Sequence, residues 1–249
     1  MSQADHQLPD SPATSTTMDA GYAYPETIPR SQSDSGRRNR VPSQIFRYRV
    51  IKRWLDCLLV IAAAPIALPI LAVIGTLVVL TSPGPVFYSH RRLRRNGSFF
   101  SMWKFRTMCV NSAEVLEDYL AGHPEARREW NQTHKLRRDP RITRLGYFLR
   151  RYSLDELPQV WNVFNGSMSL VGPRPIVAAE VEKYAEYFGF YCRVNPGLTG
   201  LWQVSGRSTL SYPARVQLDR KYVETWSLTN DLKIILKTFR SVANQDGAF

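Results

Sequence analysis

The sequence predicts an α+β fold that is predominantly α-helical, with small β elements, one re-entrant membrane helix and amphipathic interfacial helices. Residues 57–80 are uncharged and strongly apolar, and about 20 such residues suffice to span a bilayer. Several later segments repeat apolar residues every three or four positions, which is the spacing of an amphipathic helix. Only short runs bounded by turn residues are typical of strands. Helices should therefore dominate the fold.

Bulk composition predicts one membrane-associated domain with a tail. Residues 1–42 are rich in Ser, Thr, Pro and Asp and have no apolar periodicity, so we expect a disordered polar tail without a signal peptide. Residues 43–249 should form the domain, with the membrane helix in 43–81 and a cytoplasmic part in 82–249. The three cysteines are scattered with no CxxC, which argues against disulfides and a zinc site.

The net charge of +12 requires an acidic partner. Nucleic acid, an anionic membrane face and a polyphosphate substrate all have the right chemistry. A polybasic run comes directly before the apolar segment, and attraction to anionic lipid is worth about 1 kcal/mol per basic residue near a membrane. The run consists of Arg37, Arg38, Arg40, Arg47, Arg49, Lys52 and Arg53.

The apolar segment has two features that favour re-entry over spanning. Pro65 and Pro69 interrupt its middle, where proline kinks or breaks a helix. Both flanks are basic, with residues 47–53 before it and residues 91–95 after it, so the positive-inside rule places both ends on the cytoplasmic side. Prolines also occur in spanning helices, and a plain transmembrane helix stays open.

The next segments are short. Residues 86–88 are typical of a strand, and Asn96-Gly97 can close a hairpin onto residues 99–103. Residues 111–128 have helical spacing and much charge, so we expect a surface helix. The basic residues between 135 and 144 form either a solvated face or a funnel for phosphates.

Residues 149–175 contain the densest group of candidate functional side chains. A short helix is predicted from the spacing of Leu157, Val160, Trp161 and Phe164, with a stop at Asn165-Gly166. Ser153 and Glu156 match a capping box, but Pro158 favours a start at Asp155.

Asp155 and Glu156 should therefore lie at the positive end of this helix. They are either an N-cap and a first-turn acid, or a catalytic carboxylate pair. Nearby arginines could hold the negative charge of a substrate in the second case, namely Arg150, Arg151 and Arg174.

The remainder is predicted to be mostly helical. An amphipathic helix should follow Pro175 through about Phe188, and residues 194–207 should form turns with close backbone approach. Residues 215–226 and 231–242 have helical spacing. The second of these carries an apolar stripe, so it is either an interfacial membrane helix or an ordinary surface helix.

Several motifs resemble the bacterial sugar transferase family, the monotopic polyprenol-phosphate phosphoglycosyl transferases. The strongest are SLDELPQVWNV and GSMSLVGPRP, at residues 153–163 and 166–175. Similar matches are KFRTM at 104–108, RITRLG at 141–146 and PGLTGLWQVSGR at 196–207. Leu68, Pro65, His90 and Arg94 depart from the family pattern.

The resemblance implies transfer of a sugar-1-phosphate from a UDP-sugar to undecaprenyl phosphate, releasing UMP, as the priming step of exopolysaccharide or surface glycan synthesis. The sugar would be a hexose such as galactose or glucose, with N-acetylated sugars left open. The reaction would take place on the cytoplasmic face of the bacterial inner membrane. The sequence indicates no oligomeric state.

The resemblance also assigns roles to residues. Asp155 would be the nucleophile that forms a covalent phosphosugar intermediate, and Mg²⁺ would be the cofactor. Metal ligands would be Glu156, Asp219 and Asp231. Substrate and phosphate binding would involve Arg174, Lys104, Arg106, Arg150 and Gln203. Membrane insertion would depend on Lys52, Arg53, Asp56 and Pro69.

The alternative is a non-enzymatic, basic, membrane-anchored protein that binds nucleic acid. Charge alone would permit it. The sequence contains no helix-turn-helix, RNP or zinc signature, so no nucleic acid is expected.

Overall fold

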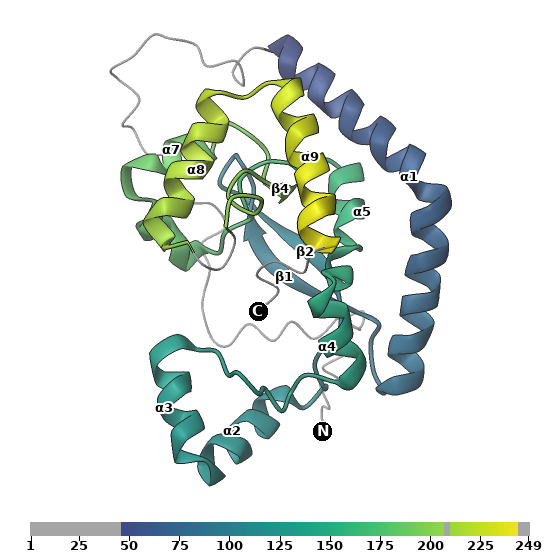
Figure 1. Cartoon of the computed structure of the whole chain (residues 1–249), viewed down its shortest axis with the longest axis vertical. Helices are drawn as coiled ribbons and strands as arrows, with labels where there is room; N and C mark the ends of the chain where they lie inside the picture. The colour runs from purple at the N-terminus through teal and green to yellow at the C-terminus, as the bar shows by residue number, and fades with distance from the viewer. Residues whose placement is uncertain (1–45, 207–209, 244–249) are drawn as a thin grey trace, which may run out of the picture.

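A computed structural model describes residues 46–206 and 210–243 of the chain (Figure 1). The described part is mostly helical with two small sheets of two strands each, which confirms the helical α+β character. The predicted polar tail, residues 1–42, lies outside the described residues. In chain order, with η for a 3-10 turn, the elements are α1 (Phe46–Thr81), β1 (Phe87–Leu93), β2 (Phe99–Phe105), α2 (Ser112–Gly122), α3 (Pro124–Thr133), α4 (Arg144–Arg151), η2 (Leu154–Glu156), α5 (Gln159–Phe164), β3 (Ser169–Val171), η3 (Ala178–Glu180), α6 (Val181–Tyr184), η4 (Ala185–Tyr187), α7 (Phe188–Tyr191), β4 (Gly197–Thr199), α8 (Tyr212–Glu224) and α9 (Leu228–Ala243).

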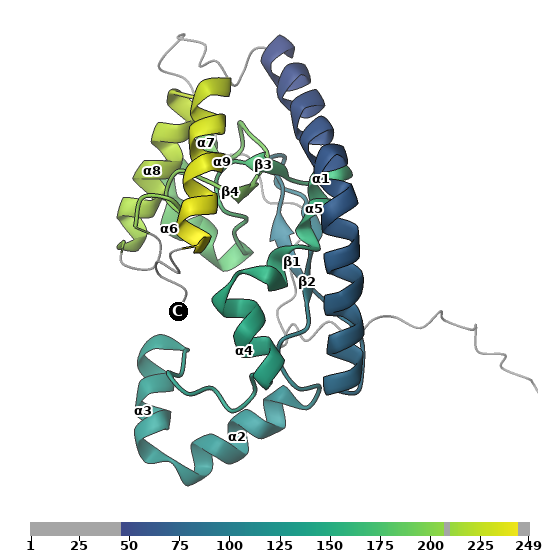
Figure 2. The same ribbon diagram turned by 45° about the vertical axis from the view of Figure 1, so that its right-hand side comes forward.

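The apolar segment forms α1, which runs along one side of the molecule and ends at the predicted boundary, Thr81. Its axis bends part-way along (Figures 1 and 2), and Pro65 and Pro69 lie inside it. Its 36 residues correspond to about 54 Å at 1.5 Å per residue, against about 30 Å of bilayer hydrocarbon. By length and composition it is the one helix in the described part that could cross a membrane. Re-entry stays a prediction.

One stripe of α1 packs against the rest of the protein. Ile74 and Val78 are buried in a cluster with Phe105 and Leu149. The other faces of α1 expose large apolar side chains, among them Leu58, Ile66, Leu68, Val73 and Leu80. A helix that is apolar on every side requires an apolar environment where the protein does not cover it.

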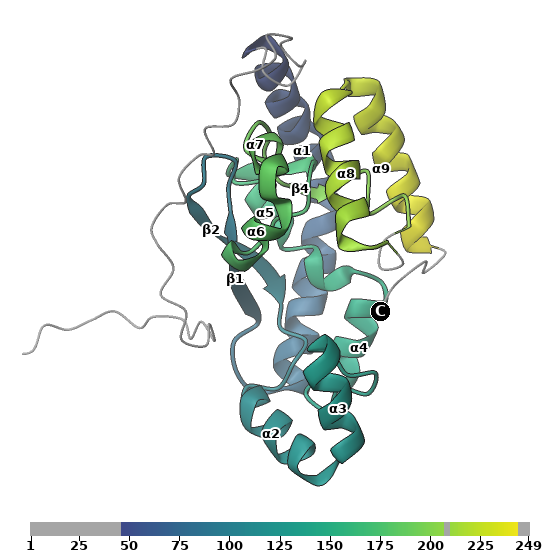
Figure 3. The same ribbon diagram turned by 90° about the vertical axis from the view of Figure 1, so that its left-hand side faces the viewer.

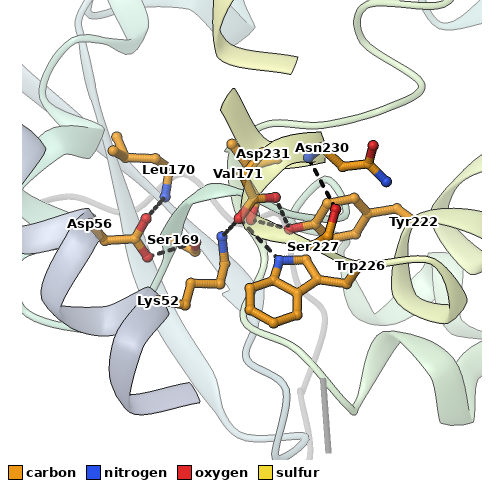
Figure 4. Close-up of polar contacts among 10 residues, drawn as sticks. All are labelled: Lys52, Asp56, Ser169, Leu170, Val171, Tyr222, Trp226, Ser227, Asn230 and Asp231. Carbon is orange, nitrogen blue, oxygen red and sulfur yellow. Dashed lines mark hydrogen bonds and ion pairs between the residues drawn. The ribbon is translucent and has the colours of Figure 1, made fainter. Parts of the chain in front are cut away.

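Polar contacts fasten the N-terminal half of α1 to the body (Figure 4). Lys52 Nζ lies 2.5 Å from Asp231 Oδ2, near the start of α9. Buried Asp56 accepts hydrogen bonds from Ser169 Oγ at 2.7 Å and from the Leu170 backbone nitrogen at 3.2 Å, both in β3. These contacts join residues more than 100 positions apart in sequence.

Arg53 completes this attachment at the end of α5. Its guanidinium donates to the backbone carbonyls of Val163 and Phe164, at the C-terminal end of that helix, where carbonyls lack partners within the regular helix. The motif that the resemblance assigns to membrane insertion therefore binds α1 to three separate elements.

The predicted hairpin is confirmed. β1 pairs antiparallel with β2, from Phe87 opposite Phe105 to Leu93 opposite Phe99. Gly97 adopts the left-handed φ of +81° that the turn requires. β2 extends two residues beyond the predicted strand and includes Lys104.

The segment predicted to hold only turns also contains a strand. β4 pairs with β3 in parallel, with Ser169 opposite Gly197. The close backbone approach predicted there is confirmed, since a Cβ on Gly197 would lie 2.1 Å from the backbone nitrogen of Gly172. Gly-Leu-Thr between Pro and Gly lacks the alternation and length of a typical strand, so the local sequence does not reveal it.

Two predicted continuous helices are broken, so these predictions were wrong. Residues 111–128 form α2 and α3, separated at His123 because the residue before Pro124 is disfavoured in helical conformation. The pair lies at one end of the molecule in all views (Figure 3). The helix expected to reach about Phe188 is divided among η3, α6, η4 and α7, with Ala185 at a φ of +46°.

The two C-terminal helices are confirmed and lie side by side (Figure 2). In α9, Ile234 is buried against the body, whereas Leu232, Leu236 and Phe239 are exposed. The apolar stripe predicted from sequence thus faces outward. An outward apolar stripe favours the interfacial interpretation over an ordinary surface helix.

We expect Gly197→Ala to destabilise the protein by roughly 3 kcal/mol, the upper end of the cost of overpacking. The new methyl group would overlap the backbone of Gly172, the residue directly after β3. Gly189→Ala is the matched control, since its Cβ would meet nothing within 4 Å. Thermal unfolding in detergent measures both. A Gly197→Ala protein as stable as the control would contradict the observed β3–β4 packing.

Candidate active site

A cleft of about 1880 Å³ lies between β2, η2, α4 and the loop that follows β4. Its lining includes Lys104, Arg106, Arg150, Asp155, Glu156, Arg174 and Gln203, the residues that the resemblance assigns to catalysis or phosphate binding, but not Arg151, the other arginine considered for the substrate's charge. These residues come from five separate parts of the chain. Folding therefore brings together the acidic pair and the predicted cationic groups.

Asp155 and Glu156 lie in the 3-10 turn η2, and α5 begins only at Gln159. The predicted helix start at Asp155 is wrong, and no side-chain cap forms at Ser153, which has a φ of +56°. Pro158 explains the break, because it has no N–H to donate to the carbonyl of Leu154 and its ring would clash with that carbonyl. The stop is confirmed, with Gly166 at a φ of +82°.

A polar side chain fixes η2 and α5 against the hairpin. Asn162 is buried; its Oδ1 accepts from the Trp103 backbone nitrogen at 3.0 Å, and its Nδ2 donates to the Ser101 carbonyl at 2.8 Å. Trp161 and Phe164, from the predicted apolar face, are exposed instead. The buried face of α5 is thus partly polar and sets the position of β2, where Lys104 follows directly.

Lys104 joins the two carboxylates. Its Nζ lies 2.6 Å from Glu156 Oε1 and 3.5 Å from Asp155 Oδ2. Burial raises the pKa of Asp155, although the charge of Lys104 opposes this effect. Burial also acts to raise the pKa of Glu156, but Lys104 and then Arg174 outweigh it, so the pKa of Glu156 is lowered. The pKa values of the two acids are therefore shifted in opposite directions from their ordinary values: that of Asp155 is raised and that of Glu156 is lowered.

Two of the predicted arginines also support the site structurally. Arg150 Nε donates to Thr107 Oγ1 at 2.9 Å, and the positive charge of Arg150 acts on Asp155. Arg106 donates to the carbonyls of Ser82 and Pro83, at 2.6 Å each, and so holds the turn that follows α1. Arg106 is thereby committed to the scaffold as well as lining the cleft.

Trp202 and Arg215 belong to the site and were missed in the sequence. The guanidinium of Arg174 lies 5.7 Å from the centroid of the Trp202 ring, and that of Arg215 lies 5.0 Å from it. Trp202 directly precedes Gln203. A helical spacing could have indicated Arg215, which is four residues before Asp219 on α8.

The three acids predicted to bind metal do not converge. In residues 46–206 and 210–243, no group of three or more His, Cys, Asp and Glu side chains is placed to hold an ion. Asp231 is instead occupied by Lys52, Tyr222 and Trp226 (Figure 4). The family resemblance that suggested a common site rests on motifs along the chain and gives no distances between α8, α9 and η2.

Asp219 is buried, accepts from Tyr184 O–H at 2.7 Å through Oδ2, and has no partner for Oδ1 among the described residues. The adjacent carboxylates of Asp155 and Glu156 are the acidic pair that faces the cleft. Two carboxylates completed by substrate phosphates are a donor set that suits Mg²⁺.

The cleft also reaches the apolar surface. Leu59, Ala62 and Ala63 of α1 line it, as do Ile235 and Phe239 of α9. One cavity thus connects a charged acidic pair to the exposed apolar faces of two helices. This arrangement can hold a water-soluble anion and an apolar chain at the same time.

Comparison with known proteins identifies related sequences. The model of the family described as bacterial sugar transferase matches residues 47–245. A UDP-galactose-lipid carrier transferase of Erwinia amylovora is 49% identical over 201 residues, which are 81% of this chain and 42% of the relative. An undecaprenyl-phosphate galactose phosphotransferase of Salmonella typhimurium is 42% identical over 238 residues, 96% of this chain and 48% of the relative.

Another relative is of similar length to this chain. The exopolysaccharide production protein ExoY of Rhizobium meliloti is 47% identical over 198 residues, which cover 80% of this chain and 88% of that protein. The chain spans less than half of the length of the Erwinia and Salmonella relatives.

We expect the stability of the protein to depend on pH through Asp219. Burial raises the pKa of this carboxyl to about 7. In the unfolded chain this carboxyl loses its proton near pH 4, whereas in the folded protein it keeps the proton up to about pH 7. The free energy of unfolding therefore falls by up to roughly 4 kcal/mol as pH rises from about 4 to 7, and it stays level above pH 7. Asp219→Asn should remove this fall. Thermal unfolding between pH 4 and 8 measures it, with Asp118→Asn, exposed on α2, as the control. Parallel curves for all three proteins would contradict the burial of this carboxyl.

Proposed function

The chain belongs to the bacterial sugar transferase family, and from that premise we propose that it transfers a sugar-1-phosphate from a UDP-sugar to undecaprenyl phosphate, releasing UMP. The names of its relatives favour galactose or glucose as the sugar. The relatives named as exopolysaccharide production proteins support a role in the priming step of exopolysaccharide or surface glycan synthesis.

The observation that carries this proposal is the carboxylate pair bridged by Lys104 in a cleft that also reaches α1. A soluble diphosphate donor needs cationic groups, and a polyprenyl acceptor needs an apolar surface. The cleft supplies both within one cavity. Arg174 and Arg150 are well suited to the phosphates, since a guanidinium binds two phosphate oxygens as a planar fork.

The first step is nucleophilic attack by Asp155. A carboxylate oxygen of Asp155 forms a bond to the phosphorus that carries the sugar, and the bond from that phosphorus to the bridging oxygen of UMP breaks. UMP leaves with the electron pair of that bond. The raised pKa of Asp155 makes its oxygen a stronger nucleophile, while Lys104 at 3.5 Å favours its ionised form.

The second step regenerates the enzyme. A phosphate oxygen of undecaprenyl phosphate attacks the same phosphorus, and Asp155 departs as a carboxylate. Two steps remove the need to hold both anionic substrates against each other at once. The small donor can react and leave before the lipid phosphate reaches the acidic pair.

Magnesium fits the acidic pair of this cleft, where Asp155 and Glu156 would hold it together with the substrate phosphates. When bound, the ion would neutralise the charge that develops on the diphosphate. Glu156, with its lowered pKa, stays ionised for this role. Lys104 would then shift its contact from Glu156 to a phosphate oxygen of the donor. Gln203 lines the cleft and can position the donor through its amide.

We place the protein on the cytoplasmic face of the bacterial inner membrane, with α1 re-entering that face. Exposed apolar residues on α1, α5 and α9 are consistent with immersion, among them Trp161 and Phe239. The comparisons give no support to the nucleic-acid-binding alternative.

A covalent intermediate predicts labelling of the protein without lipid. Incubation with UDP-sugar, labelled at the phosphate that carries the sugar, and Mg²⁺ should give labelled protein and an equal amount of UMP. Asp155→Asn should give neither, because an amide cannot form the acyl phosphate. Asp118→Asn, exposed on α2, should label like the wild type. Mass spectrometry and nucleotide chromatography measure the two products. Release of UMP only after undecaprenyl phosphate is added would rule out the covalent route.

Re-entry predicts that both ends of α1 face the cytoplasm. After the three native cysteines are replaced by serine, Phe46→Cys and Ser82→Cys should react with an impermeant maleimide only when the inner membrane is opened. Replacing Pro65 and Pro69 together by alanine should favour spanning, since an unbroken apolar run of this length can cross. If either cysteine is labelled in intact spheroplasts while Pro65 and Pro69 are still in place, α1 spans the membrane.

A further inference from the structure

Arg92, on β1, lines the cleft and has no part in the transfer reaction as proposed above. In the hairpin it lies opposite Phe100, and four pairs further along Tyr88 lies opposite Lys104. Alternate residues of a strand share a face, so the side chains of Arg92 and Lys104 project from the same face of the hairpin. The neighbouring Arg91 projects from the other face, is exposed, and is not among the described residues that line the cleft.

The side chain of Arg92 is fastened to the segment that directly follows Arg174. Its Nη1 donates to the carbonyl oxygen of Pro175 at 3.2 Å and lies 3.6 Å from Glu180 Oε2. The same carboxylate oxygen of Glu180 accepts from the backbone nitrogen of Val177 at 3.0 Å. Arg92 therefore contacts this segment both directly and through Glu180.

Backbone hydrogen bonds hold the chain on both sides of Arg174. Before it, the carbonyl of Pro173 accepts from the backbone nitrogen of Gly197, in β4, at 2.7 Å. After it, the backbone nitrogen of Leu93, in β1, donates to the carbonyl of Ile176 at 3.0 Å. The backbone of Arg174 is thus fixed between the two small sheets.

The side chain of Arg174 depends on this backbone for its position. Arg174 is exposed, and within the described part of the chain no hydrogen bond or ion pair holds its guanidinium. Its contact with the Trp202 ring, at 5.7 Å from the centroid, is a loose one. The residue before a proline is restricted to extended conformations, so Pro175 limits the backbone of Arg174 further. A shift of Pro175 would therefore move the guanidinium.

The charges of Arg92 and Arg174 reach each other and the acidic pair. Burial and then the charge of Arg174 lower the pKa of Arg92. Burial acts to raise the pKa of Glu156, and the charge of Lys104 is the largest that opposes it. Arg174 and then Arg92 add to this opposition, so the pKa of Glu156 is lowered. Two guanidinium groups from different elements thus act on the carboxylate where the donor's diphosphate would lie.

We propose that Arg92 is a positioning residue, which holds the carbonyl of Pro175 and thereby directs the guanidinium of Arg174 to the diphosphate of the donor. The inference rests on the proposed function, because the donor is the UDP-sugar of that reaction. A guanidinium must be placed accurately to bind phosphate as a fork. Loss of Arg92 should therefore weaken binding of the donor and leave binding of the lipid acceptor unchanged.

The test is a double-mutant cycle on the whole protein in detergent, with Arg92→Met, Arg174→Gln and the two combined. Arg91→Met is the matched control, because it removes the same charge from the same strand on the opposite face. Titration calorimetry measures binding of UDP in the presence of Mg²⁺. Steady-state release of UMP gives KM separately for UDP-galactose or UDP-glucose and for undecaprenyl phosphate.

Arg92→Met should weaken UDP binding and raise KM for the UDP-sugar by about tenfold, as expected for one lost charge-assisted hydrogen bond. KM for undecaprenyl phosphate should not change. Because Arg92 acts through Arg174, the combined variant should bind UDP no more weakly than Arg174→Gln alone. Arg92→Lys keeps the charge but not the fork, and should be intermediate. Melting temperatures check folding, and Arg92→Lys replaces Arg92→Met in the cycle if the latter does not fold.

Three results would overturn the inference: UDP binding by Arg92→Met equal to that of the wild type, equal weakening in Arg91→Met, or fully additive losses in the combined variant, which would make Arg92 act independently of Arg174. A wild type that binds UDP but releases no UMP would refute the proposed reaction alone, since the cycle can still be measured by UDP binding. A wild type that does not bind UDP would refute both.

Discussion

The buried contact between Asp56 and β3 is the constraint on which the arrangement of this protein depends. Asp56 belongs to an apolar helix whose other contacts with the body are one buried apolar stripe and the side chains of Lys52 and Arg53. Its carboxylate accepts from Ser169 and Leu170, and a buried acceptor left without these donors would cost about 1–3 kcal/mol or more. The bond therefore fixes both the rotation and the height of α1. Lys52, one turn earlier, fastens the same helix to α9.

With α1 in this position, the cleft has charged side chains on one part of its wall and apolar side chains on another. Phe105, at the end of β2, packs between α1 and α4, and Lys104 beside it points to the carboxylates. The apolar side chains of α1 near Ala62 then line the same cavity as Asp155. The proposed reaction, in which a soluble anion meets a lipid, fits this cleft because α1 forms part of its wall. The attachment of α1 to the body therefore also decides which apolar side chains line the cleft.

Much of the fold follows from local patterns. The apolar run, the Asn-Gly hairpin and the periodicity of α8 and α9 each depend on residues close in sequence, and each was predicted correctly. Proline was underestimated in two places. Pro158 divides η2 from α5, and Pro124 divides α2 from α3. In both cases the missing N–H and the steric restriction on the preceding residue override helical periodicity over the longer window.

The sequence alone determined which side chains we propose for the chemistry, since Asp155, Glu156, Lys104 and Arg174 lie in motifs that resemble those of the family. Only the tertiary structure decided how they are grouped. It brought Lys104 onto the acidic pair and added Trp202 and Arg215 to the cleft. It also placed Asp231 away from that pair, where it forms an ion pair with Lys52. The physical reason is that periodicity reports which face of one helix a residue occupies, whereas contacts between elements depend on packing across many residues of intervening chain.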